Sequence, residues 1–173
     1  MDYLRENKKP VLLHDEAFTV MINSEDKLTV AEGGVNSPIV WDYNFGGFTD
    51  SIYENYKVEV LNAGHNGFVR APQIFLYMVC DGLGDTGYFF KKKLTQTQNI
   101  LAVLPTTALG ADYIQATGSA GVTFLVKNAR TRKRISIRFL RPDLAETVHE
   151  TDINVAGVTR WFLILKLTPI TDV

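Results

Sequence analysis

Hydrophobic and polar residues alternate along most of this chain, with the period of two that is typical of half-buried β-strands. The clearest case is residues 56–60, where the apolar Tyr56, Val58 and Val60 alternate with charged residues. Such alternation is common in antiparallel sheets that have one face buried and one face in water. The pattern predicts eight strands, at residues 17–24, 41–45, 56–60, 73–80, 99–105, 122–127, 134–141 and 160–167.

Two of the predicted strands are apolar on both faces. Residues 73–80 follow Pro72, which suits the start of a strand, and their composition indicates a central strand. Residues 160–167 form the most apolar run of the chain. We expect its alternate residues to face the core between two sheets, namely Trp161, Leu163 and Leu165.

Stretches rich in glycine and asparagine separate the strands and predict turns, since these residues adopt positive φ at little cost. They are residues 32–38, 62–67, 81–87 and 118–121. A helical period is only hinted at residues 142–150, which are too few for a crossover helix.

Many short strands without helices between them predict an all-β fold, a single eight-stranded antiparallel jelly-roll sandwich. We place it at residues 17–169, between a polar N-terminal arm (1–16) and a C-terminal tail (170–173). An immunoglobulin-like sandwich would give the same alternation, so the order of the strands stays open.

Composition narrows the classes of function. The 173 residues suit one domain; 18 Lys and Arg against 19 Asp and Glu give a net charge of −1. A chain this close to neutral lacks the positive field that favours non-specific nucleic-acid binding, so no nucleic-acid partner is expected. The single cysteine excludes an intrachain disulfide. No apolar run approaches the ~18 residues of a membrane span, and the charged start lacks the features of a secretion signal.

One literal motif, G-x-G-x-x-G, occurs at Gly82, Gly84 and Gly87, directly after a predicted strand. In a dinucleotide site these glycines let the backbone approach a pyrophosphate at the N-terminus of a helix. Residues 88–98 keep no helical period, so the expected helix is missing. We therefore interpret the motif as a turn and predict no dinucleotide cofactor.

Residues that could support metal or nucleophile chemistry are few. The histidines occur singly, and we expect them on exposed loops; they are His14, His65 and His149. Cys80 lies in an apolar strand, where a thiol is usually buried and inert. Asp81 and Asp85 share a loop but fall short of a calcium-binding loop. We predict no catalytic residue, no metal site and no cofactor, and hence a protein that is not an enzyme.

Aromatic and basic clusters are the candidates for contacts between subunits. We select Tyr88, Phe89, Phe90, Arg130, Arg132, Lys133 and Arg134. Aromatic residues at strand ends are enriched at interfaces, but these three and the similarly placed Tyr53, Tyr56 and Tyr113 would serve equally well as caps of the sandwich. The basic residues are alternatively solvated turns or phosphate contacts.

The basic run at 130–134 and the acidic stretch at 143–152 flank one predicted strand. At roughly 3.3 Å per residue they lie about 25 Å apart, beyond the ~8 Å screening length of physiological salt. We therefore expect at least one of them to pair with a neighbouring subunit or another protein.

A resemblance enters at residues 18–27, where Phe18 leads a strand into a turn containing Ser24, Asp26 and Lys27. This segment resembles the opening of single jelly-roll minor capsid and penton proteins of large icosahedral, nucleocytoplasmic-type DNA viruses. Lys27 stands where those proteins carry Arg. The likeness continues through short segments at residues 37–38, 56–60, 72–76 and 162–167.

The resemblance implies a non-enzymatic structural protein of the virion capsid, made in the host cytoplasm. It further implies assembly with itself, as a homopentamer, and with other capsid proteins such as a major capsid protein. The alternative from a different class is a ligand-binding sandwich, lectin-like or receptor-type.

Overall fold

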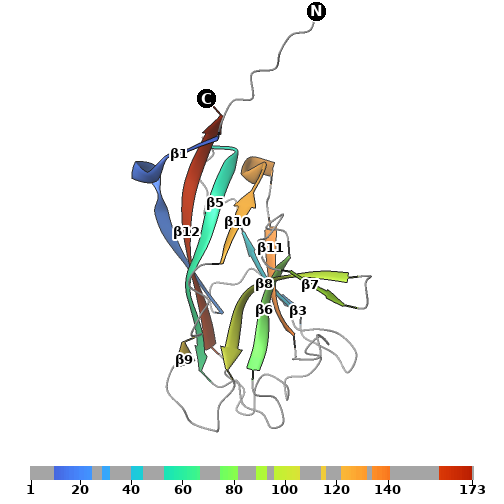
Figure 1. The fold of residues 1–173 in the computed structure, drawn as a ribbon. Coiled ribbons are helices and arrows are strands. Elements are labelled where there is room, and N and C mark those ends of the chain that lie inside the picture. The colour runs from blue at the N-terminus through green and yellow to red at the C-terminus, as the bar shows by residue number, and fades with distance from the viewer. Residues whose placement is uncertain are drawn as a thin grey trace, which may run out of the picture.

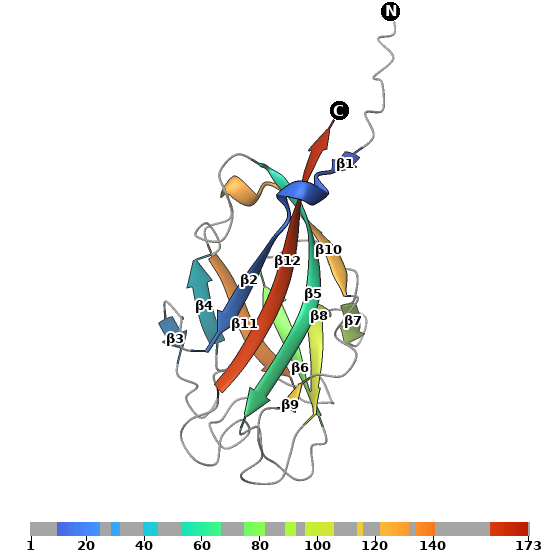
Figure 2. The ribbon, with the colours of Figure 1, turned by 90° about the vertical axis from the view of Figure 1, so that its left-hand side faces the viewer.

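Two antiparallel β-sheets face each other in the computed structural model, and the core lies between them (Figures 1 and 2). The described residues are 10–24, 29–31, 40–44, 53–66, 75–81, 89–92, 96–105, 114–115, 122–131, 134–140 and 160–172. Within them the only helical segments are two 3-10 turns, η1 (His14–Glu16) and η3 (Ala129–Thr131). The predicted all-β sandwich is confirmed.

The first sheet, here the β12 sheet, is built on the two longest strands. Its members are β1 (Pro10–Leu12), β2 (Phe18–Asn23), β12 (Arg160–Asp172), β5 (Asn55–Asn66), β9 (Ile114–Gln115) and β10 (Thr123–Val126). β12 pairs with β1 and β2 along one side and with β5 along the other, and β5 in turn pairs with β9 and β10.

The second sheet, here the β11 sheet, has the order β3-β4-β11-β6-β8-β7. Its members are β3 (Thr29–Ala31), β4 (Val40–Asn44), β11 (Arg134–Leu140), β6 (Phe75–Asp81), β8 (Gln96–Pro105) and β7 (Phe89–Lys92). Every pairing in both sheets is antiparallel.

The strands pair as a set of nested hairpins. β6 pairs with β8, β5 with β10, β4 with β11, and β2 with β12, so the chain doubles back on itself around the β6–β8 hairpin. The β5–β12 and β6–β11 pairings then join these hairpins into the orders β2-β12-β5-β10 and β4-β11-β6-β8. This is the strand order of a jelly roll.

The predicted count of eight strands is not confirmed. Each of the eight predicted segments overlaps one strand of the nested set, but the described part of the chain also contains β1, β3, β7 and β9. These additional strands have two to four residues, too few to show a clear alternation. They form because an adjacent longer strand offers a free edge.

The sheet also extends past the predicted domain boundaries at 17 and 169. β1 lies in the expected N-terminal arm, and β12 continues through most of the expected C-terminal tail. The two extensions pair with each other, from Pro10 opposite Asp172 to Leu12 opposite Ile170. Each one supplies the hydrogen-bond partners that the other would lack.

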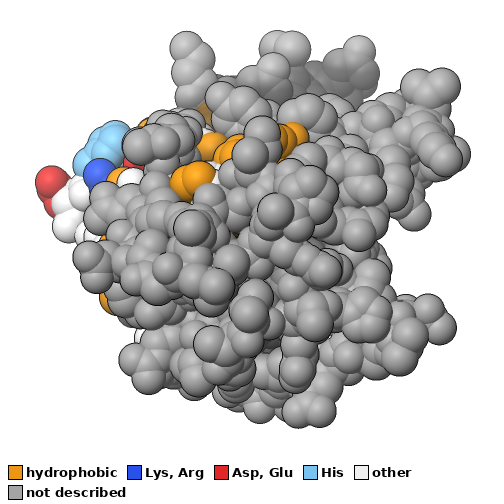
Figure 3. Space-filling model, turned by 90° about the horizontal axis from the view of Figure 1, so that it is seen from below, with side chains coloured by type: hydrophobic (Ala, Val, Ile, Leu, Met, Phe, Trp, Pro, Cys, Tyr) orange, Lys and Arg blue, Asp and Glu red, His pale blue; other side chains and the backbone are white. Residues whose placement is uncertain are grey.

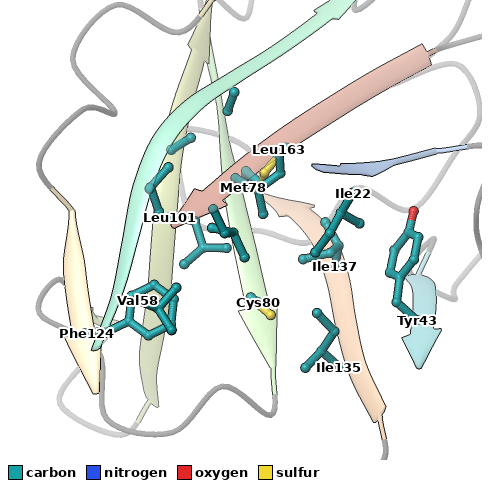
Figure 4. Close-up of a cluster of buried hydrophobic side chains, with 14 of the residues drawn as sticks. Ile22, Tyr43, Val58, Met78, Cys80, Leu101, Phe124, Ile135, Ile137 and Leu163 are labelled. Atoms are coloured by element: carbon teal, nitrogen blue, oxygen red, sulfur yellow. The ribbon is translucent and has the colours of Figure 1, made fainter. Parts of the chain in front are cut away.

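The core follows the alternation of β12. Trp161, Leu163 and Leu165 are buried, as predicted. The Trp161 ring meets the ring edges of Tyr43 in β4 and Phe139 in β11, at centroid distances of 5.8 and 5.7 Å. Figure 4 shows side chains from both sheets pointing toward one another across this core. Burying each large apolar side chain contributes roughly 1.5–3 kcal/mol.

The prediction of a turn at residues 62–67 is wrong over residues 62–66, because β5 runs through them to Asn66. Residues 62–66 pair with β12 on one side, and Gly64 and His65 also pair with β9 on the other. A register shift opposite Ile164 and Leu165 marks a β-bulge in the middle of the strand. Pairing on both sides outweighs the local preference of glycine and asparagine for turns.

The chain crosses from β10 to β11 through a tight connection at the end of the sandwich. Asn128 has φ 55°, the left-handed region that asparagine tolerates better than most residues. Its carbonyl accepts hydrogen bonds from the backbone N–H and the hydroxyl of Thr131. The amide of Ala129 donates to the Glu54 carbonyl at 2.7 Å, which holds this connection against the start of β5.

Candidate functional site

The outer face of the β12 sheet, which lies toward the viewer in Figure 2, carries an exposed group of apolar side chains. We call it the outer patch and define it as Met21, Leu61, Leu125, Phe162 and Ile164. Met21, Leu61 and Leu125 are 56%, 43% and 46% exposed, and the other two are half-buried. Three of the five large hydrophobic residues exposed in the described part of the chain therefore lie on one sheet face.

Register and a bulge bring Met21, Leu61 and Ile164 together, whereas Leu125 on β10 stands opposite Lys57, farther along β5. Met21 on β2 stands opposite Ile164 on β12, which stands opposite Asn62 on β5. Leu61 is the extra residue of the β-bulge between Val60 and Asn62. A bulge places two residues of one strand against one of its partner, so Leu61 joins the apolar row beside Ile164.

Charged side chains of both signs lie between Leu125 and the other members of the outer patch. Lys57 and Glu59 on β5 form an ion pair of 3.2 Å, with side chains 28% and 31% exposed. Lys166 on β12 stands opposite Glu59 in the register. The face therefore combines an apolar centre with neighbouring positive and negative groups, the composition of many protein–protein contacts.

The outer face of the β11 sheet has a different character near β11. Arg138 donates to both carboxylate oxygens of Asp81, at 2.7 and 3.3 Å. Asp42 accepts a hydrogen bond of 2.5 Å from the Ser136 hydroxyl and pairs with Arg134 at 3.3 Å. Asp81 is thus the last residue of β6 and holds a guanidinium, rather than lying in a loop as predicted.

The structure places two of the predicted basic contact residues at the surface. Arg130 and Arg134 have side chains 47% and 58% exposed. Each has a carboxylate of its own chain nearby, since Arg130 lies 3.7 Å from Glu54 and Arg134 lies 3.3 Å from Asp42. From the sequence alone, only residues 143–152 were considered as acidic partners of the basic run. Glu54 and Asp42 precede that run by many residues and approach it only in the folded sheet.

Two of the other predicted contact residues lie in an edge strand. Phe89 and Phe90 belong to β7, opposite Asn99 and Gln98 of β8, at one edge of the β11 sheet. Tyr88, Arg132 and Lys133 lie outside the described residues, as do Tyr113, Asp85 and residues 143–152.

Of the strand-end aromatics, two cap the sandwich. Tyr56 is fully buried, and the half-buried Tyr53 packs against it with perpendicular rings at 6.3 Å. The Tyr53 hydroxyl donates to the Glu16 carboxylate of η1. Both tyrosine side chains therefore make their contacts with residues of the same subunit.

Candidate groups for metal or nucleophile chemistry are dispersed. No group of three possible metal ligands occurs among the described residues. Cys80 is buried, as predicted. His14 is exposed in η1, His149 lies outside the described residues, and His65 is buried, which contradicts the expected exposed loop position. No helix in the described ranges is long and apolar enough to cross a membrane.

The outer patch was not predicted from the sequence. Its signal was the presence of apolar residues on both faces of residues 160–167, where Phe162 and Ile164 alternate with the core residues. Comparison with family models, curated proteins and solved structures found no match to this chain.

Proposed function

We propose that the protein is a non-enzymatic structural subunit of a virus capsid, which assembles with copies of itself and with other shell proteins. The nested strand order of a jelly roll carries this proposal. The resemblance of residues 18–27 to the opening of single jelly-roll capsid proteins supports it, and β2 accounts for most of that segment.

The outer patch is the contact that we assign to a second copy of this chain. Lys166 and Glu59 lie beside these apolar residues on the same sheet face, so a copy of that face can offer opposite charges to it. Four strands at about 4.8 Å spacing and six residues at about 3.3 Å give a face of roughly 400 Å². This is about half of what a stable interface buries on each partner, so each contact is weak and assembly depends on repetition.

Light scattering coupled to size exclusion, over a range of protein concentrations, tests the proposal. We expect the parent chain to form a closed oligomer whose population rises with concentration. The double variant Met21→Lys, Leu61→Lys should raise the concentration for half-assembly at least about tenfold, since charged side chains would be desolvated in the contact. The matched control is Val103→Lys, which changes a 43% exposed residue on β8 in the other sheet.

Two outcomes would contradict the proposal in different ways. Equal loss of assembly in the control would show that the outer patch is not the contact. A parent chain that stays monomeric at all concentrations, alone and with a candidate shell protein, would favour the ligand-binding sandwich.

A further inference from the structure

β10 forms one edge of the β12 sheet. It pairs with β5, from Thr123 opposite Glu59 to Val126 opposite Tyr56, and no strand of the described ranges pairs with its other side. It lies toward the upper end of the molecule in Figure 1, away from the end seen from below in Figure 3, where hydrophobic side chains are visible among the described residues. An edge strand keeps a row of backbone N–H and C=O groups that no neighbouring strand satisfies.

The hydrogen bond just before β10 shows which of its residues face that edge. The amide of Val60 donates to the carbonyl of Val122 at 2.9 Å. Directly opposite residues of an antiparallel pair exchange hydrogen bonds at every second position. Phe124 and Val126 therefore bond to β5, whereas the amide and carbonyl of Leu125 point away from it.

β10 lacks the features by which edge strands usually avoid pairing. Its four residues, Thr-Phe-Leu-Val, include no charge and no proline, and three of them favour strands. The Leu125 side chain is 46% exposed on the outer face, at the same position as the outward backbone groups. By contrast, β1 at the other end of the sheet order begins with Pro10. The edge of β10 is therefore suited to accept a further strand.

We propose that this edge pairs with the β10 edge of a second copy of the chain, antiparallel and centred on Leu125. The two-fold axis makes the contact self-complementary, because each Leu125 donates one backbone hydrogen bond to the other and accepts one from it. The two leucine side chains then lie side by side on the outer face, and the β12 sheets of both copies continue as one sheet. The contact is made by the strand edge, so it does not depend on the face contact proposed above.

Charge favours a second copy as the occupant of this edge. In the register centred on Leu125, the exposed Lys127 of one copy stands opposite Thr123 of the other. Thr123 in turn stands opposite Glu59 on β5. Lysine and glutamate of different copies are then two strand spacings apart, about 10 Å between backbones, which their extended side chains can span. The two lysines lie on opposite sides of the axis, about 13 Å apart along the strands, so they do not repel at close range.

Proline substitution tests the pairing without disturbing the ladder to β5. Leu125→Pro removes the outward N–H, and proline is tolerated on an edge strand where that group faces away from the neighbour. The matched control is Thr19→Pro in β2, also exposed. Because the Ser24 amide donates to the Trp161 carbonyl, the same alternation directs the Thr19 amide away from β12.

Both prolines are introduced into the Met21→Lys, Leu61→Lys variant, in which the face contact is disabled, and analytical ultracentrifugation measures dimerisation. We expect the Lys variant to form a dimer, Leu125→Pro to raise its dissociation constant at least about tenfold through the loss of two hydrogen bonds, and Thr19→Pro to leave it unchanged. A monomeric Lys variant, or equal dissociation constants for the two prolines, would overturn the edge pairing. Failure of the face contact would show separately, as equal assembly of the parent and the Lys variant.

A cysteine at the axis provides a second test that needs no proline. Opposite residues of a hydrogen-bonded pair have Cα atoms about 5.5 Å apart, within the range of a disulfide. The native Cys80 is buried, so Leu125→Cys in the Lys variant adds an accessible thiol. We expect mild oxidation to cross-link Leu125→Cys into a dimer much faster than the control Val103→Cys, which replaces a 43% exposed residue of β8. Equal rates of cross-linking would overturn the proposal.

Discussion

Trp161 is a buried side chain of β12 that packs against two aromatic rings of the opposite sheet. Its ring lies nearly perpendicular to Tyr43 and Phe139 of the opposite sheet, with interplanar angles of 79° and 71°. Edge-to-face pairs of this kind contribute roughly 0.5–1.5 kcal/mol beyond the burial of their area. One side chain of β12 thereby stabilises the contact between the sheets.

We expect Trp161→Ala to lower the free energy of unfolding by roughly 3–5 kcal/mol, because the small side chain leaves a cavity that the sandwich cannot fill. Trp161→Phe retains an aromatic ring and should lose less. Denaturant unfolding followed by circular dichroism measures both variants. An unchanged midpoint for Trp161→Ala would show that this side chain does not support the core.

Position 128 restricts the residue type through its backbone conformation and not through the packing of its side chain. Its φ of 55° suits glycine and is unfavourable for a β-branched residue. Asn128→Gly should therefore change stability little, whereas Asn128→Val should cost about 1–2 kcal/mol. Thermal unfolding of the two variants checks this, and equal midpoints would mean that the connection relaxes to another conformation.

At the scale of elements, the sequence predicts a strand well where one of its faces is buried. It fails where the strand forms only because it pairs with segments distant in sequence. All eight predicted segments overlap strands of the nested set because alternation is a local property of the chain. Residues 62–66 were mispredicted because their strand depends on β12 and β9, which are distant in sequence. The burial of His65 was missed for the same reason.

The candidate surface was harder to predict than the strands. Alternation indicates that a strand has two different faces. It does not indicate which face packs against the other sheet and which face stays exposed. The bulge that adds Leu61 to the outer patch is a property of the β5–β12 register and has no local signature. The carboxylate partners of Arg130 and Arg134 likewise emerge only from the folded topology.

β1 is a separable element. Pro10 and Val11 are exposed, and within the part of the chain that the structure describes the strand pairs with the last residues of β12 alone. Removing residues 1–12 should lower the Tm by less than about 4 °C, because little apolar area is lost. Hydrogen exchange should show lost protection at residues 170–172 and unchanged protection at 163–167. Unfolding of the truncated chain would contradict this and make β1 part of the core.

At the scale of the whole molecule, we expect the exposed basic residues Arg130 and Arg134 to affect the proposed assembly more than stability. Arg130→Gln and Arg134→Gln should each change the free energy of unfolding by less than about 1 kcal/mol, because exposed ion pairs contribute little. If the basic run contacts another subunit, the double variant should assemble more slowly than the parent at low salt and alike at high salt.

Time-resolved light scattering measures that difference, with Lys127→Gln as the matched control on an exposed neighbouring position. Assembly of the double variant at the parental rate in low salt would indicate that Arg130 and Arg134 serve only their own carboxylates, Glu54 and Asp42.

The nested pairing also constrains how the chain is made. β12 is the last of the described strands to leave the ribosome, yet it lies between β2 and β5 in the finished sheet. At about 5–20 residues per second, β2 emerges roughly 7–30 s before the strand that it needs. Once β5 has also emerged, the facing edges of β2 and β5 lack their common neighbour until β12 follows, and unpaired edges invite association with other chains. Folding therefore competes with association: β12 must pair with β2 and β5 before another chain does. We expect slower translation to lower the yield of folded protein.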